Sequence, residues 1–307
     1  MTYDQIKQKA LELTTYFETS TKAPDCFGIV AGNFDEQGIS WGCVQFNFGQ
    51  GTLQPIFTDL INEHPQVVRD AFTNQADHDL FVDLILNKTL TEQIAFGDSI
   101  SNPSNKSLVI EPWKTYFFDL GITQESIDRQ VEALESYYAN ALTWFHEYKF
   151  WSRRAYALMF DISIQNGGIA TETKNLILND FEAMSIVGKT KNQIETERMR
   201  IVANRRAEAS ATQWIETVRG RKLAIANGTG WVYNGGLYMD TTRYDMTLEE
   251  AFPPEKFRIY IDAGYGGTDT GGTLTGSTTL AKDITLDIAL KLRNILLTRY
   301  TGHEILL

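Results

Sequence analysis

Two adjacent prolines, Pro253 and Pro254, do most to limit how this chain of 307 residues can fold. Proline lacks a backbone N–H and restricts the residue before it, so the pair ends a helix and stiffens the chain at that point. Before the pair the apolar pattern is mainly helical; after it come a strand, a Gly/Thr-rich loop and a helix. We therefore expect two units, residues 1–250 and 257–307, joined by a proline linker over residues 251–256.

The first unit is expected to be mainly helical with a small β-hairpin. Apolar residues at helical spacing predict a helix over residues 4–18. Short strands are expected at 27–31 and 39–46, joined by a turn-rich connection. From Leu53 to about residue 226 the pattern is helical, and residues 229–245 predict a hairpin or an irregular loop. With the β–α–β pattern after the prolines, the fold class is α+β.

Composition excludes several classes of protein. The chain carries 39 acidic and 28 basic residues, a net charge of −11, which argues against a protein that tracks nucleic-acid phosphates. Its two cysteines cannot build a disulfide framework and are expected to be free thiols or small buried residues. There is no apolar run of the roughly 20 residues that a membrane span needs. The N-terminus has no apolar signal segment, so we expect synthesis in the cytoplasm without a signal peptide.

Two carboxylates are notable for the predicted elements on which they lie. Glu18 is at the end of the first predicted helix, and Asp35 lies in the connection between the two predicted strands. Glycoside hydrolysis uses two carboxyl groups, one as acid and one as base or nucleophile. A helix end and a hairpin tip can hold such a pair across a groove. By spacing alone, an ordinary helix-end carboxylate and a turn-forming aspartate remain the alternative.

The residues around these carboxylates resemble a known family. Residues 17–20 and 32–42 resemble the catalytic region of chitosanases of glycoside hydrolase family 46, which belong to the lysozyme-like superfamily. The resemblance implies that Glu18 is the general acid, Asp35 the general base and Ser40 a residue that orients the attacking water. Residues 157–168 and 218–222 resemble a central helix and a later basic helix of that family. Asp161 paired with Arg219 or Arg221 is therefore a candidate supporting ion pair, with an ordinary buried structural pair as the alternative.

The segment after the predicted hairpin departs from the chitosanases. Residues 45–53 resemble a branch of cell-wall hydrolases found in phage and bacterial peptidoglycan-targeting proteins. That resemblance implies that Gln45, Asn47 and Gln50 line a groove and bind N-acetyl or hydroxyl groups. Local bonds that stabilise turns are the alternative for these amides. Trp41 is a candidate for stacking on a sugar ring, with packing in the core as its alternative.

Residues 257–307 resemble a second family. The run 259–269 resembles the opening strand and loop of zinc-dependent N-acetylmuramoyl-L-alanine amidases, 282–292 the next helix and 302–307 the second strand. The first zinc ligand of that family, a His, is Tyr265 here, and the second, a Glu, falls on Ala281; His303 matches a position that is not a ligand. A catalytic zinc needs three protein ligands and a water. We therefore expect this partial segment to hold no metal and no other cofactor, and to be inactive as an amidase.

These features favour a peptidoglycan hydrolase that cleaves β-1,4 amino-sugar bonds with inversion, of the phage endolysin or tail and injection-particle type. One alternative is a non-catalytic structural or wall-binding component of a phage tail or contractile injection system; another is a chitosanase. Because both Glu18 and Asp35 are present, we favour the enzyme. The expected partners are cell-wall glycan and, through the C-terminal segment, a second copy or particle proteins, with no nucleic acid and no membrane span. The protein would reach the wall by holin-type release or as part of a particle.

Overall fold

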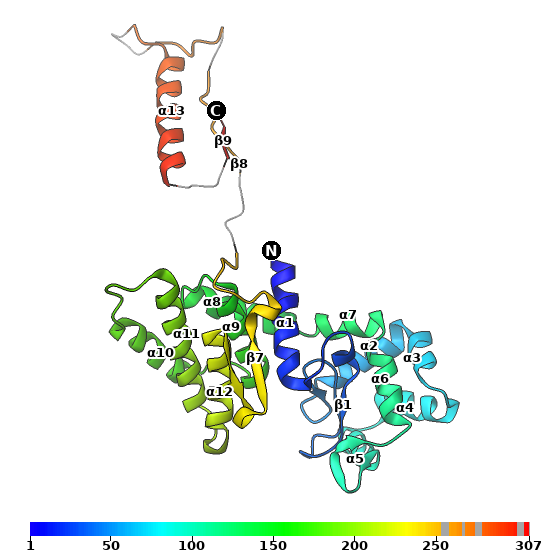
Figure 1. The fold of residues 1–307 in the computed structure, drawn as a ribbon. Helices are drawn as coiled ribbons and strands as arrows, with labels where there is room; N and C mark the ends of the chain where they lie inside the picture. The colour runs from blue at the N-terminus through cyan, green and yellow to red at the C-terminus, as the bar shows by residue number, and fades with distance from the viewer. Residues whose placement is uncertain (253–257, 266–267, 274–277, 300–303, 307) are drawn as a thin grey trace. The chain divides into compact units, whose positions relative to one another are not determined.

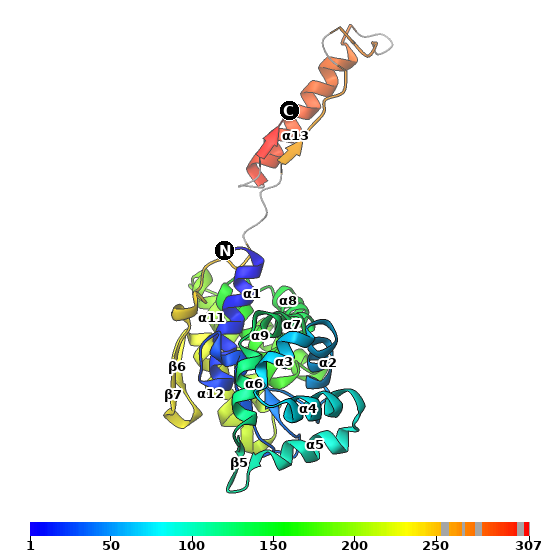
Figure 2. The same cartoon turned by 90° about the vertical axis from the view of Figure 1, so that its right-hand side faces the viewer.

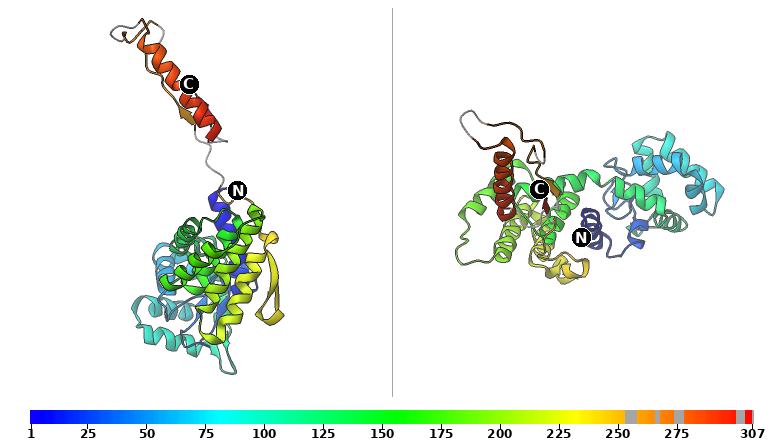
Figure 3. Two further views of the ribbon diagram at one scale, coloured as in Figure 1. Left: turned by 90° about the vertical axis from the view of Figure 1, so that its left-hand side faces the viewer. Right: turned by 90° about the horizontal axis from the view of Figure 1, so that it is seen from above.

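The computed structural model describes residues 1–252, 258–265, 268–273, 278–299 and 304–306 (Figure 1). The chain divides into two compact units, Met1–Ala251 and Phe252–Leu307. The first unit contains two groups of helices with a long N-terminal helix, α1, between them (Figure 3). The second unit is a small β–α–β arrangement.

Helix α1 spans Tyr3–Thr19 and confirms the predicted helix over residues 4–18. A capping box starts it: the Thr2 side chain accepts from the Gln5 backbone N–H, and the Gln5 side chain accepts from the Thr2 backbone N–H. The residues that set the sequence period are buried, namely Ile6, Ala10, Leu13 and Phe17. The helix ends at Ser20, which has a left-handed conformation with φ +54°. Glu18 therefore lies in the last turn of a helix that is capped at its start and packed into the core along one face.

A three-stranded antiparallel sheet comes after a short 3₁₀ turn, η1 (Asp25–Gly28). Its strands are β1 (Val30–Ala31), β2 (Ser40–Trp41) and β3 (Phe46–Asn47), in the order β1-β2-β3. The predicted strands 27–31 and 39–46 were too long. Phe27 belongs to the 3₁₀ turn, and a turn closed by the bond from Gln45 N to Gly42 O divides the second stretch. Gly42 and Gln45 both have positive φ, which ends a strand.

The first group of helices surrounds an aromatic core. It comprises α2 (Leu53–Glu63), α3 (Pro65–Ala71), α4 (Gln75–Asn87), α5 (Leu90–Ser99), α6 (Trp113–Gly121) and α7 (Gln124–Glu132). Phe57 lies at the centre of this core, with ring centroids of Phe81 at 5.0 Å and Phe117 at 5.9 Å. A small hairpin, β4 (Ser101–Asn102) with β5 (Asn105–Val109), interrupts the helical region that the sequence predicted.

The second group is built around a buried central helix, α9 (Arg153–Asn166), of which residues 155–163 are all buried. Its other helices are α8 (Glu135–Glu147), α10 (Thr171–Ala183), α11 (Lys191–Glu208) and α12 (Ile215–Asn227), with a 3₁₀ turn, η2 (Thr212–Trp214), before α12. Helix α9 contacts α1, α8 and α12. The hairpin β6 (Thr229–Val232) and β7 (Leu237–Asp240) packs along α12 (Figure 2), and its tip is a 3₁₀ turn, η3 (Tyr233–Gly235). The chain then forms η4 (Thr241–Tyr244).

In the second unit, β8 (Arg258–Tyr260) pairs in parallel with β9 (Glu304–Leu306), and α13 (Ala281–Arg299) connects them. The expected β–α–β pattern and the α+β class are confirmed. Both cysteines, Cys26 and Cys43, are free and buried. No helix in the described part of the chain combines the length and the apolarity that crossing a membrane requires.

Candidate functional site

Charged side chains from three helices meet at the end of α1. From α9 comes Asp161, which accepts bonds from the Nη2 atom (2.7 Å) and the Nε atom (3.1 Å) of Arg221 on α12. The same guanidinium places its Nη1 atom 2.7 Å from Glu18 Oε1. Lys222 donates from Nζ to the Asp161 carboxylate and, at 3.1 Å, to its backbone oxygen. One arginine thus joins a buried carboxylate to one that reaches the surface.

Burial makes this cluster electrostatically unusual. Asp161, Arg221 and Lys222 are all at least 99% buried, with exposed side-chain fractions of 0%, 1% and 0%. Burial alone would raise the pKa of Asp161, but the adjacent charges of Arg221 and Lys222 hold it below its usual value. Burial lowers the pKa of Lys222 to about 7, in spite of the neighbouring carboxylate. With Glu18 included, two acidic and two basic side chains meet at this point.

Glu18 is the exposed member, since 22% of its side chain is accessible. Its Oε1 atom is buried against Arg221 but has no donor in hydrogen-bond alignment. The contact is therefore one of charge rather than of a directed bond. The Arg221 guanidinium also lies 4.6 Å from the centroid of the Phe17 ring, the residue before Glu18. These contacts hold the end of α1 while leaving 22% of the Glu18 side chain accessible.

Tyr233, at the tip of the β6–β7 hairpin, adds a contact that sequence reasoning missed. Its hydroxyl accepts from Arg221 Nη1 at 3.3 Å and donates to the backbone oxygen of Phe17 at 3.1 Å. The hairpin tip is thereby tied to the last turn of α1. The only signal in the sequence was an aromatic residue in a Gly-rich segment. Lys222 was also missed as a member of the cluster, because a lysine in the basic run 219–222 suggests a solvent-facing side chain.

The connection between β1 and β2 presents Asp35 at the surface. Asn33 anchors it: its N–H donates to Ser101 Oγ at 2.8 Å, and its side-chain oxygen accepts from Gly38 N at 2.9 Å. Asp35 is exposed, and its Oδ1 accepts from Gln37 N at 3.2 Å, an Asx-turn contact. The ring before it, Phe34, is 59% exposed and was not singled out from the sequence. A loop held at both ends thus carries an accessible carboxylate beside an accessible aromatic ring.

The structure does not support a sugar-binding role for Trp41. Its side chain is fully buried, its Nε1–H donates to Phe117 O at 2.9 Å, and its ring centroid lies 4.7 Å from that of Phe57. No face of the ring is available to a ligand. The prediction of stacking is therefore wrong, because the hairpin packs this side of β2 onto the aromatic core.

Two of the three predicted amide residues are engaged in turns. Gln45 donates from Nε2 to Gly42 O at 3.0 Å, and the buried Asn47 accepts from Gln50 N at 2.8 Å, so both stabilise turns. Gln50 is exposed, and Ser40 is buried in β2 with 5% exposure. Among these residues, only Gln50 presents its side chain freely to solvent.

Of the two arginines proposed as partners of Asp161, the structure places Arg221 there and Arg219 elsewhere. Arg219 pairs with Glu216 at the surface of α12. An α-helix turns about 100° per residue, so residues two apart point about 200° from each other. When Arg221 points into the protein toward α9, Arg219 must point out.

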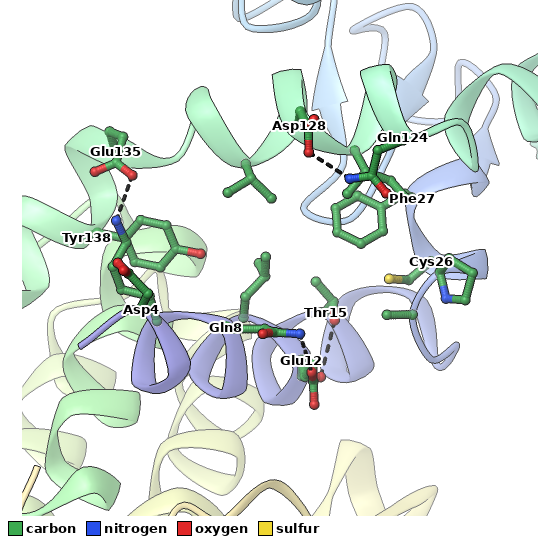
Figure 4. Close-up of a pocket in the computed structure, with 16 residues that line it drawn as sticks. Asp4, Gln8, Glu12, Thr15, Cys26, Phe27, Gln124, Asp128, Glu135 and Tyr138 are labelled. Carbon is green, nitrogen blue, oxygen red and sulfur yellow. Dashed lines mark hydrogen bonds and ion pairs between the residues drawn. The ribbon is translucent and has the colours of Figure 1, made fainter. Parts of the chain in front are cut away.

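A cavity with a volume of about 610 Å³ lies between α1 and the α7–α8 segment (Figure 4). Gln8, Glu12, Cys26, Asp128 and Tyr138 are among the residues that line it. Burial raises the pKa of the Cys26 thiol to about 11. Neither Glu18 nor Asp35 lines this cavity, so it is separate from the predicted carboxylate pair.

No group of three or more His, Cys, Asp or Glu side chains in the described part of the chain is placed to hold a metal ion. Tyr265, at the position of the first zinc ligand of the amidases, is 56% exposed. Ala281, at the position of the second, is the first residue of α13. His303 lies outside the described residues.

Comparison with known proteins shows partial likenesses. No protein-family model matches the chain. Its fold is similar to that of a family 46 chitosanase from Gynuella sunshinyii, with 14% identity, a TM-score of 0.45, and coverage of 73% of this chain and 86% of that one. A chitosanase from Bacillus subtilis MY002 gives 16% identity, a TM-score of 0.46 and the same coverage.

One curated sequence, the N-acetylmuramoyl-L-alanine amidase CwlM of Bacillus licheniformis, is 46% identical over 50 residues, or 16% of this chain. The chain spans only 19% of the length of that relative. The solved structures and the curated relative thus fall in the two enzyme groups whose motifs the sequence resembles.

Proposed function

We propose that this protein is a glycoside hydrolase that cleaves β-1,4 amino-sugar bonds of bacterial peptidoglycan, with Glu18 as general acid and Asp35 as general base. The observation that carries the proposal is the placement of Glu18. It is a partly accessible side chain at the end of α1, held against a buried ion cluster that α9 and α12 supply. A glycosidase acid must be both fixed in position and open to the substrate.

The cluster is better explained by positioning than by stability. A buried ion pair gains little over well-packed apolar residues, because removing the charges from water costs several kcal/mol per ion. Here the pair extends to a surface carboxylate through Arg221, and Tyr233 ties the same guanidinium to the backbone beside Glu18. The arrangement holds Glu18 in position and places the positive charge of Arg221 beside it.

Asp35 suits the role of base because its loop is anchored on both sides while its carboxylate faces solvent. In an inverting enzyme the base activates a water, and the two carboxyl groups lie about 6.5–9.5 Å apart. We propose inversion because Glu18 and Asp35 come from separate elements, the end of α1 and the β1–β2 connection, so that Asp35 can activate a water while Glu18 protonates the leaving group. The anomeric form of the first product, monitored by proton NMR during the reaction, is expected to be α from a β-linked substrate.

The choice of peptidoglycan rests on the second unit. Its motifs resemble those of muramoyl-alanine amidases, and the curated relative is named for that activity. A chain that joins two wall-directed segments suggests a phage lysin or a particle-borne hydrolase, and this is the setting we propose. Because Tyr265 and Ala281 replace zinc ligands, we propose that the glycosidase unit does the hydrolysis and the second unit none.

Release of reducing ends tests the proposal. The full chain is incubated with purified peptidoglycan and, separately, with chitosan, whose ammonium groups would suit the acidic chain. We expect new reducing ends from peptidoglycan and few from chitosan. Faster release from chitosan would favour a chitosanase instead. Binding to walls without any release would favour a non-catalytic wall-binding component.

A further inference from the structure

Two adjoining cavities lie at the C-terminal end of the central helix α9. Their volumes are about 510 Å³ and about 390 Å³, and both are lined by Asn166, Arg206 and Ala209. Trp144 lines the first cavity, and Trp214 lines the second. The two cavities thus share an amide and a guanidinium group, and each has an indole ring in its lining.

Arg206 is distinguished by its charge environment. It is half-buried and donates from Nη1 to Ser210 Oγ at 3.3 Å and from Nη2 to the backbone oxygen of Asn166 at 3.2 Å. No carboxylate of the described residues lies within 4.0 Å of it. Its neighbour Arg205, in contrast, pairs with Asp180 and Glu208. Burial alone lowers the pKa of Arg206, with no neighbouring acid to counter that effect.

A half-buried guanidinium without an acidic partner is a favourable place for an anion. The side-chain oxygens of Gln165 and Asn166 are buried at the same place without a hydrogen-bond partner. They suit the N–H or O–H donors of a ligand. The cavities therefore present, within one site, a cation for an acid group and acceptors for an amide or hydroxyl.

The two tryptophans add surfaces that suit a sugar. Trp214 is 57% exposed. Trp144 packs against Gly168, which has φ +129°; a Cβ there would meet the indole at 3.1 Å, so glycine allows the close approach. Indole faces take up the C–H faces of sugar rings while their surroundings bond the polar edges. Aromatic walls with planar amide and guanidinium groups fit a saccharide better than a free inorganic anion.

We propose that these paired cavities bind an acidic saccharide, namely an N-acylated sugar that carries a carboxylate. The carboxylate would pair with Arg206, and the acyl N–H or a hydroxyl would donate to the amide oxygens. A glucosamine unit, which carries an ammonium group and no carboxylate, is disfavoured next to the unpaired guanidinium. The site is also close to the ion cluster along the chain, because Gln165 is one helical turn beyond Asp161 and Thr217 one turn before Arg221. The inference goes beyond the proposed hydrolysis, since it concerns binding and needs no cleavage.

Titration of the full chain with single sugars tests the proposal. The probes are N-acetylmuramic acid, N-acetylglucosamine, which lacks the carboxylate, and glucosamine, which is a cation; binding is measured by calorimetry. We expect N-acetylmuramic acid to bind at least about tenfold more tightly than N-acetylglucosamine, as loss of one charge-assisted bond implies. Arg206→Gln should remove that preference, Arg206→Lys should keep part of it, and the exposed control Arg243→Gln should leave it unchanged.

Trp214→Ala keeps the test decisive if Arg206→Gln fails to fold, since the indole is mostly exposed. This substitution should lower the affinity for N-acetylmuramic acid several-fold and leave the melting temperature unchanged. Equal affinity for the three sugars, or an unchanged preference in folded Arg206→Gln, would overturn the proposal, as would unchanged binding in Trp214→Ala. None of the probes contains a glycosidic bond between sugars, so failure of the proposed hydrolysis would leave these results unaffected.

Discussion

At the scale of single residues, one guanidinium faces two carboxylates. Arg221 is 1% exposed and lies between buried Asp161 and accessible Glu18. A planar guanidinium with five donors can satisfy two acids from different helices, which a lysine ammonium does less well. The position and the charge of Glu18 are therefore coupled to groups that no substrate touches.

Removing the buried acid should be strongly destabilising. Asp161→Asn leaves Arg221 and Lys222 as buried cations without their main partner. We expect the free energy of unfolding to fall by about 3–5 kcal/mol, measured by urea denaturation. Asp180→Asn is the matched control, since its pair with Arg205 lies at the surface and is screened by solvent. Similar losses in both variants would contradict the importance assigned to the buried cluster.

Asp161 should also make the stability of the protein fall at low pH. The pKa of Asp161 is lower in the folded protein than its ordinary value of 3.8, so the folded state binds its proton less readily than the unfolded chain. Its contribution is complete above the unfolded pKa of about 3.9 and is lost as pH falls through the lower folded pKa. Melting temperature should thus drop below about pH 4, and less steeply in a folded Asp161→Asn variant. Parallel curves for the two proteins would refute this assignment.

Single residues also show what the sequence can predict. Asp161 and Arg221 could be found because residues 157–168 and 218–222 resemble a central helix and a later basic helix of the family 46 chitosanases. For Trp41 the sequence left stacking and core packing open, since a short hairpin has two faces and the pattern does not say which one packs inward; its full burial decides for the core. Tyr233 could not be found, because its contact with Phe17 O joins residues 216 positions apart.

At the scale of elements, two hairpins position the candidate site. The β1–β2 connection carries Asp35, and the tip of the β6–β7 hairpin holds the last turn of α1 through Tyr233. The long helices were predictable because their period of 3.6 is repeated over several turns. The strands β1 and β2 were located but predicted too long, and the β4–β5 hairpin was not predicted, because a two-residue strand such as β4 shows no alternation.

Loss of the Tyr233 hydroxyl should slow catalysis without unfolding the protein. In Tyr233→Phe the ring remains, but the links to Arg221 and to the Phe17 backbone oxygen are lost. We expect kcat on peptidoglycan to fall by about tenfold, with KM nearly unchanged, because the neutral bond to the Phe17 oxygen is worth about 0.5–1.5 kcal/mol and the longer bond from the charged Arg221 guanidinium adds to it. The control is Tyr238→Phe, on the same hairpin. A change confined to KM, or an equal effect in the control, would argue against a positioning role.

At the scale of the whole molecule, the chain contains two compact units of very different size. The change of pattern at the prolines predicted two kinds of architecture, and a β–α–β arrangement does occur after them. The cavities at the end of α9 could not be predicted from the sequence, because they depend on how α8, α9, α11 and α12 pack together.

The second unit should not retain zinc. A tyrosine and an alanine stand where the amidases have a histidine and a glutamate, so fewer than three protein ligands remain. After zinc loading and dialysis, elemental analysis of the full chain should find far less than one zinc per chain. Retention of one equivalent would show that other residues complete a site.

The central claim is that Glu18 protonates the leaving sugar. Glu18→Gln keeps the size of the side chain but cannot supply the proton, and Glu36→Gln is a control in the exposed β1–β2 loop. The measurement is the rate of reducing-end release from purified peptidoglycan by both variants and the wild type. We predict a loss of at least about a hundredfold in Glu18→Gln and little change in Glu36→Gln, as removal of a general acid implies. A Glu18→Gln protein that releases reducing ends at the wild-type rate would contradict the claim.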